Sequence, residues 1–240
     1  MKPFGARSAK QTALAVVVVA SLGSACGGSS ARAAVPRSDA GVRATIMFVG
    51  DSNVAYSLSA LATALTDRDQ AYQVIDVARA GTGIRTPDCH QGGDRCPSGD
   101  YWKIRLPDAL QHVTPDGFVV NLGINDTSFV GAATGPGYAA YGAKIDWLMH
   151  LLPAAKPVWW SNLPCVIEPK DRAAGCAAVN DALAAAAHRW RNLVVIDWAA
   201  TADGHQDYLF SNLKGIHLSG PGAQAYANLV AKALDHHFPT

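Results

Sequence analysis

The feature that most constrains the fold of this chain is a repeated alternation of short, continuously apolar runs with longer alanine-rich segments. Each short run is too continuously apolar for a strand with one exposed face, so it would be buried on both faces, as the strands of a parallel sheet are. Helix-length segments between the runs supply the crossovers that such a sheet requires. The pattern predicts an α/β fold, a three-layer α/β/α sandwich around a five-stranded parallel sheet. The expected strands are 45–49, 72–77, 117–122, 157–162 and 193–198, and the expected helices are 54–65, 101–112, 138–152, 173–191 and 222–236.

The N-terminal residues 1–43 do not share this pattern. A basic start is followed by an apolar run at 13–22, about half of the roughly 20 residues that a membrane-spanning helix needs. A basic start with a short apolar run predicts a secretory signal at 1–26 and therefore an exported protein. Residues 27–43 are rich in Ser, Ala, Arg and Pro and predict a flexible tether. The remainder, 44–240, has the length of one folded domain.

The end of the signal has two interpretations. The sequence from Leu22 to Cys26 resembles a lipobox, although Gly23 takes the place of the usual aliphatic residue. Lipidation of Cys26 would anchor the protein on the outer side of the cytoplasmic membrane. Cleavage after Ala31-Arg32-Ala33 would instead discard Cys26 and release a secreted protein. The sequence favours the lipoprotein and leaves both interpretations open.

The other four cysteines form two close pairs along the chain. In an exported protein, Cys89 with Cys96 and Cys165 with Cys176 predict two disulfides. A zinc site built from Cys89, His90 and Cys96 is the weaker alternative, because their spacing matches no zinc pattern. No cofactor or metal is expected. The net charge is only +1, with scattered Lys and Arg, so nucleic acid is a poor candidate partner. Oligomeric state cannot be derived from these features.

A serine follows the first expected strand directly, in Gly50-Asp51-Ser52-Asn53, where a helix is expected to begin. This turn would place the Ser52 hydroxyl at the carboxyl edge of the sheet, where sites of α/β proteins collect. The helix N-terminus there favours negative charge. Gly-Asp-Ser is also an ordinary turn and serine an ordinary N-cap. The tripeptide alone is therefore a weak indication of a nucleophile.

Three further residues follow expected strands or precede an expected helix. Gly81 lies in a glycine-containing turn after the second strand, where the backbone can approach a ligand closely. Asn125 follows the third strand and carries an amide that can donate to an oxyanion. His217 lies just before the last helix. Each residue type is also common in turns or on surfaces, so none is decisive alone.

Together and in this order, these segments resemble the SGNH (GDSL-type) hydrolase family. The matching positions are Ser52 in Gly-Asp-Ser, Gly81, Asn125 in Gly-x-Asn-Asp, and His217 in Gly-x-His-Leu-Ser, over about residues 45–236. The resemblance implies a flavodoxin-like SGNH hydrolase fold and a serine esterase mechanism. Ser52 would be the nucleophile and His217 its base. The oxyanion would be held by the N–H groups of Ser52 and Gly81 and the amide of Asn125.

The chain departs from the family pattern beside its histidine and beside its serine. The family has an orienting Asp three residues before the histidine, where this chain has Lys214. Asp207 and Asp203 are the nearest upstream carboxylates that might replace it. A backbone carbonyl near Lys214 is the favoured alternative, as the acceptor of the Nδ1 proton. Asn53 stands where the name-giving motif has Leu, and this change is expected to cost little.

Three functions are compatible with these residues. The leading hypothesis is a carboxylic ester hydrolase for acetyl or short acyl groups, acting on a small-molecule or glycan ester, possibly cell-envelope material. The second is transfer of the acyl group to a sugar hydroxyl. The third is a non-catalytic envelope-binding lipoprotein with a degenerate site. Several tryptophans might line a cleft, although they are more often core residues: Trp102, Trp147, Trp159 and Trp160.

Overall fold

The computed structural model of the protein describes residues 20–21, 41–66, 71–84, 101–131, 136–166, 170–209 and 215–239. In this part of the chain the strands form one parallel sheet in the order β1-β3-β2-β4-β5-β6. The predicted α/β fold is confirmed, and the five predicted strands are β2 to β6. The strands are β1 (Ala20–Ser21), β2 (Val42–Gly50), β3 (Ala71–Asp76), β4 (Gly117–Asn121), β5 (Val158–Ser161) and β6 (Leu193–Ile196).

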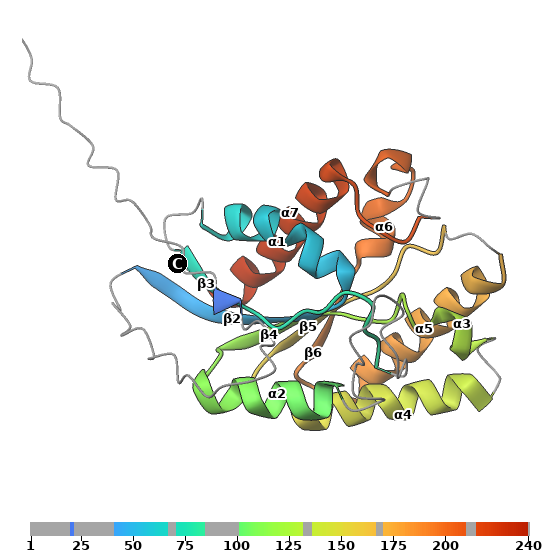
Figure 1. Ribbon diagram of the computed structural model, residues 1–240, viewed down its shortest axis with the longest axis horizontal. Coiled ribbons are helices and arrows are strands. Elements are labelled where there is room, and N and C mark those ends of the chain that lie inside the picture. The colour runs from blue at the N-terminus through green and yellow to red at the C-terminus, as the bar shows by residue number, and fades with distance from the viewer. Residues whose placement is uncertain are drawn as a thin grey trace, which may run out of the picture.

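The helices cover both faces of the sheet (Figure 1). One layer contains α1, α6 and α7, and the opposite layer contains α2 to α5. Their bounds are α1 (Ser52–Thr66), α2 (Tyr101–His112), α3 (Thr127–Val130), α4 (Pro136–Leu151), α5 (Lys170–Arg189), α6 (Trp198–Ala202) and α7 (Gly220–His237), with a 3-10 turn η1 (Gln206–Tyr208). None of the helices within the described ranges is long and apolar enough to cross a membrane.

The burial of β2 explains why the expected strands are mostly apolar. Ile46 and Phe48 belong to the core on the α1 and α7 side, and Met47 and Val49 to the core on the other side. All four are fully buried. Successive side chains of a strand point to opposite faces, so a strand covered on both sides carries apolar residues on both of its faces.

Several sequence-based predictions concern residues outside the described ranges. These are Cys26 and the cleavage site at 31–33, most of the tether, the predicted Cys89–Cys96 disulfide with His90, and Lys214. The sequence analysis missed β1, which lies within the predicted signal. It also missed α3, α6 and η1. Three of the four tryptophans are core residues, since Trp102, Trp159 and Trp160 are buried.

Candidate active site

Ser52 is the first residue of α1, at the turn that follows β2. The turn is tight: a Cβ on Gly50 would lie 2.3 Å from Cγ2 of Val54. The Asp51 carboxylate accepts a hydrogen bond from the Asn53 N–H at 2.9 Å, so Asp51 caps the start of the helix. These contacts fix the Ser52 side chain at the carboxyl end of β2.

The segment that carries His217 is fixed to the turn around η1. The Ser219 N–H donates to the Tyr208 carbonyl at 2.9 Å, and the Ser219 hydroxyl caps α7 by accepting from the Gly222 N–H at 3.1 Å. A Cβ on Gly222 would lie only 1.9 Å from the Tyr208 carbonyl oxygen. Only glycine therefore allows α7 to begin this close to η1.

The structure brings Ser52 and His217 together. Nε2 of His217 lies 2.9 Å from Oγ of Ser52, within hydrogen-bond distance. Burial lowers the pKa of His217 below its usual range, because the charged imidazolium loses solvation. A neutral imidazole can accept the proton of the serine hydroxyl. The pair therefore has the geometry of a nucleophile and its general base.

Nδ1 of His217 is buried and has no hydrogen-bond partner among the described residues. The two carboxylates that were considered as its partner do not reach it. Asp203 and Asp207 are exposed, and the Asp207 carboxylate lies 3.9 Å from Nδ1 of His205. Asp207 instead contributes its backbone carbonyl, which accepts from the Ser219 hydroxyl. A carbonyl near Lys214 remains the prediction for the Nδ1 partner.

The predicted oxyanion donors lie around the same sheet edge. Gly81 has a φ of 80°, a conformation that favours glycine. In the described part of the chain, no backbone carbonyl accepts from the N–H groups of Ser52 or Gly81. The Asn125 amide nitrogen donates to the Thr82 carbonyl at 2.8 Å and lies 3.5 Å from the Asp51 carboxylate. Asn125 is thus held against both the Gly81 turn and the Ser52 turn.

Asp126 fixes the turn that contains Gly81, a role that the sequence analysis did not recognise. Its carboxylate accepts from the Ile84 N–H at 2.9 Å, and a Cβ on Gly83 would lie 2.2 Å from the same carboxylate. On the other side, the Trp102 indole donates to the Gly83 carbonyl at 3.2 Å. The available signal was Asp126 itself, an acid next to Asn125 in the turn that follows β4.

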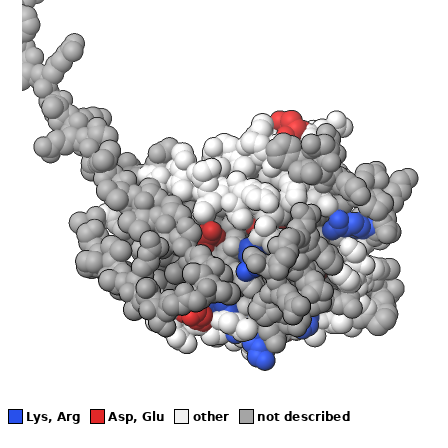
Figure 2. Space-filling view, viewed as in Figure 1, with Lys and Arg blue, Asp and Glu red and all other residues white. Residues whose placement is uncertain are grey.

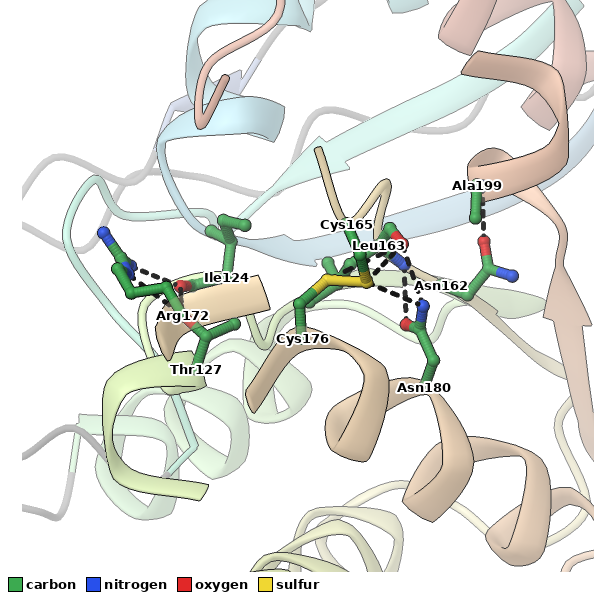
Figure 3. The surroundings of a disulfide bond; sticks show 9 residues. All are labelled: Ile124, Thr127, Asn162, Leu163, Cys165, Arg172, Cys176, Asn180 and Ala199. Carbon is green, nitrogen blue, oxygen red and sulfur yellow. Dashed lines mark hydrogen bonds between the residues drawn. A yellow bond between two sulfur atoms is a disulfide. The ribbon is translucent and has the colours of Figure 1, made fainter. Parts of the chain in front are cut away.

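Helix α5 fixes the segment that carries Asn125 (Figure 3). Arg172 donates to the Ile124 carbonyl at 2.9 Å and to the Thr127 hydroxyl at 3.1 Å. A Cβ on Gly175 would lie 1.8 Å from the Thr127 carbonyl oxygen. The helix and the segment are therefore in contact through their backbones.

A disulfide attaches the next segment along the sheet edge to the same helix (Figure 3). The structure joins Cys165 to Cys176 with a Cα–Cα distance of 5.5 Å, which is the pairing that the sequence predicted. Asn180, one turn further along α5, accepts from the Leu163 N–H and donates to the Leu163 carbonyl, both at 2.8 Å. The segments after β4 and β5 are thus both held by α5.

The buried carboxyl groups beneath Ser52 set the electrostatics of the site. Asp51 and Asp126 are both fully buried. Burial, together with the nearby charge of Asp126, raises the pKa of Asp51 to about 7, although the Asn53 N–H opposes this shift. The ionised form of Asp51 is therefore costly in the folded protein at neutral pH.

We expect Asp51→Asn to reduce the loss of stability that the protein shows as the pH rises. The folded pKa of Asp51, about 7, is above its value of 3.8 in the unfolded chain. Its stabilising contribution is therefore fully present below pH 3.8 and is lost as the pH rises through 7. The free energy of unfolding falls by on the order of 4 kcal/mol in total over this range. Melting temperatures of both proteins between pH 5.5 and 8 measure this, and the decline of the variant should be smaller by about 5 °C or more.

Asp181→Asn, an exposed substitution on α5, is the control and should parallel the wild type. The lowered pKa of His217 has the opposite effect on the free energy of unfolding: it costs stability as the pH falls below 6.5. This effect is common to all three proteins. Parallel curves for Asp51→Asn and the wild type would show that Asp51 is not the titrating group.

The sequence comparison identifies the family to which this site belongs. Residues 48–225, well over half of the chain, match the GDSL-like Lipase/Acylhydrolase family. The chain is a member of that family. The matched region begins within β2, just before Ser52, and ends within α7. A comparison with curated protein sequences gives no match.

Several solved structures share the fold. The C-terminal catalytic domain of peptidoglycan O-acetyltransferase A (OatA) from Streptococcus pneumoniae is 18% identical, with a TM-score of 0.59 over 80% of this chain and 93% of that one. A lipase/acylhydrolase from Enterococcus faecalis is 16% identical, with a TM-score of 0.59 over 80% and 96%. Est24, a carbohydrate acetylesterase from Sinorhizobium meliloti, is 18% identical, with a TM-score of 0.57 over 81% and 99%.

Possible metal ligands do not gather in the described part of the chain, and neither do the described charged side chains on the face drawn in Figure 2. The described residues contain no group of three or more His, Cys, Asp or Glu side chains that could hold a metal ion. On the face drawn in Figure 2, the described charges of both signs are scattered and form no stripe of one sign.

Proposed function

We propose that this protein is a serine esterase that removes acetyl or other short acyl groups from carbohydrate hydroxyls. The observation that carries the proposal is the 2.9 Å contact between Oγ of Ser52 and Nε2 of His217, at the carboxyl end of β2. The fold and family support ester chemistry, and the carbohydrate acetylesterase and the OatA domain support a carbohydrate ester as substrate.

In the proposed reaction, Oγ of Ser52 attacks the ester carbonyl while Nε2 of His217 accepts its proton. The N–H groups of Ser52 and Gly81 stabilise the oxyanion that forms. The Asn125 amide nitrogen, which donates to the Thr82 carbonyl in this structure, is the third proposed donor to the oxyanion. His217 then returns the proton to the leaving alcohol. A water molecule, activated by the same imidazole, releases the acid from acyl-Ser52.

An exposed aromatic ring beside His217 supports a substrate in which a sugar is the alcohol part of the ester. Tyr56 lies one turn after Ser52 on α1, and its side chain is 67% exposed. Its ring contacts the His217 ring edge-to-face, with a centroid distance of 5.6 Å. Exposed aromatic rings at a site provide flat apolar surface on which a sugar ring can pack. The basic start and the apolar run at 13–22 support a substrate outside the cytoplasm.

The test is hydrolysis by the purified domain of acetylated xylan, acetylated peptidoglycan and p-nitrophenyl acetate, measured as released acetate. Appearance of an acetylated sugar acceptor in place of free acetate would assign a transferase instead.

We expect Tyr56→Ala to raise KM for acetylated oligosaccharides about tenfold, because about 50 Å² of buried apolar surface stabilises binding by about 1.3 kcal/mol. The KM for p-nitrophenyl acetate should change less than threefold.

Tyr56→Phe is the matched control, because it keeps the ring and should leave both KM values within threefold of the wild type. If Tyr56→Ala affected the two substrates equally, the ring would act on His217 and not on a sugar.

A further inference from the structure

The side chain of Asn53 holds the backbone on both sides of His217. Its amide nitrogen donates to the Ile216 carbonyl at 3.1 Å, and its amide oxygen accepts from the Leu218 N–H at 3.2 Å. Asn53 is 7% exposed, so these bonds are shielded from solvent. One amide thus pairs with both neighbours of the proposed base.

Asn53 is also fixed directly to the proposed nucleophile. It follows Ser52 in α1, and its own N–H donates to the buried Asp51 carboxylate. The side chain therefore connects the turn after β2 to the segment before α7, which lie far apart in the sequence. The length of this connection sets the distance between the Ser52 backbone and the His217 backbone.

The imidazole of His217 needs such a constraint more than a histidine with a carboxylate partner does. Its Nδ1 has no partner among the described residues, and the Asp203 and Asp207 side chains are exposed. The ring is contacted on its edge by Tyr56, but that residue is itself largely exposed. A displacement of about 1 Å in a reacting group can cost about a hundredfold in rate.

We propose that Asn53 is a positioning residue for His217, acting through the Ile216 carbonyl and the Leu218 N–H to hold the imidazole against Ser52. This inference rests on the proposed serine esterase function for its kinetic readout. The proposal differs from the expectation that asparagine at this position has little effect. The amide pairs both with an acceptor and with a donor of the backbone, which the leucine of the name-giving motif cannot do.

The test is Asn53→Leu, which keeps the number and branching of the side-chain heavy atoms and removes both hydrogen bonds. The expected result is a 30- to 100-fold lower kcat with KM changed less than threefold, because binding of the ester is unaffected. Asn53→Asp, which can still accept from Leu218 N–H but cannot donate to Ile216, should give a smaller loss. Asn228→Ala, on the exposed face of α7, should match the wild type. A kcat within threefold of the wild type in folded Asn53→Leu would overturn the proposal.

A double-mutant cycle separates this role from a general effect on the fold. In a His217→Ala background, Asn53→Leu should lower the residual kcat by less than threefold. An equal loss in both backgrounds would overturn the proposal, because the effect would not pass through His217.

Nitrogen NMR of the His217 ring provides a readout that needs no esterase activity. The wild type should give one sharp set of ring signals, and Asn53→Leu and Asn53→Asp should give broadened or doubled signals. Unchanged signals in both variants would overturn the positioning role. A wild type with a single ring conformation but no ester hydrolysis would contradict the proposed function and leave the role of Asn53 standing.

Discussion

Ser52→Ala is expected to lower kcat/KM for ester hydrolysis by at least about 10⁴-fold while the protein remains folded. The variant removes only the hydroxyl that lies 2.9 Å from Nε2 of His217, and neither the Asp51 cap nor the backbone of α1 depends on it. His217→Ala should cause a similar loss, and the double variant should be no worse, because the two residues act as a unit. Initial rates with p-nitrophenyl acetate measure the effect.

The same helix provides a matched control. Ser57 is 1% exposed, and its hydroxyl has no hydrogen-bond partner in the described structure. Ser57→Ala should therefore retain wild-type activity. A fluorophosphonate probe should label the wild type and Ser57→Ala, but not Ser52→Ala. Retention of more than about a tenth of the activity in Ser52→Ala would exclude a covalent mechanism, and an unlabelled wild type would favour the non-catalytic binding protein.

Asn125→Ala should lower kcat by about 100- to 1000-fold with little change in KM, which is the usual cost of removing one oxyanion donor. The effect falls on kcat because the amide would bind the charged oxygen more strongly than the ester carbonyl of the ground state. Single-turnover measurements of acyl-enzyme formation would locate the loss in the first chemical step.

Asn192→Ala controls for the loss of an asparagine side chain as such. Asn192 donates to the Lys156 carbonyl at 2.9 Å and precedes β6, at the amino ends of the strands. It makes the same type of hydrogen bond as Asn125, but at the opposite edge of the sheet. Equal losses in the two variants would refute the oxyanion role of Asn125.

The main elements of the fold could be predicted because each element's pattern is local. The strands β2 to β6 are mostly apolar, and segments of helical length separate them, so the layers follow from the sequence. The short elements α3, α6 and η1 could not be predicted in this way. They contain three to five residues each and depend on tertiary contacts, such as those that Arg172 and Gly175 make with Thr127.

The candidate site was predictable to the extent that strand ends define it. Ser52, Gly81 and Asn125 each follow a strand of one parallel sheet, so their proximity could be expected. His217 was assigned from the family resemblance, and the structure places it beside Ser52. The burial of Asp51 and Asp126 and the two hydrogen bonds of the Asn53 side chain were not predictable. They depend on which groups face each other across segments distant in the sequence.

The close backbone contacts at Gly175 and Gly222 also determine how this protein can be engineered. A side chain at either position would collide with a carbonyl oxygen, of Thr127 or of Tyr208, and would displace a segment next to Asn125 or His217. A mutant library for altered substrate range should therefore leave both glycines unchanged. Diversity is better placed at exposed positions such as Tyr56 and Val166, where new side chains meet solvent and the framework that holds the site is not disturbed.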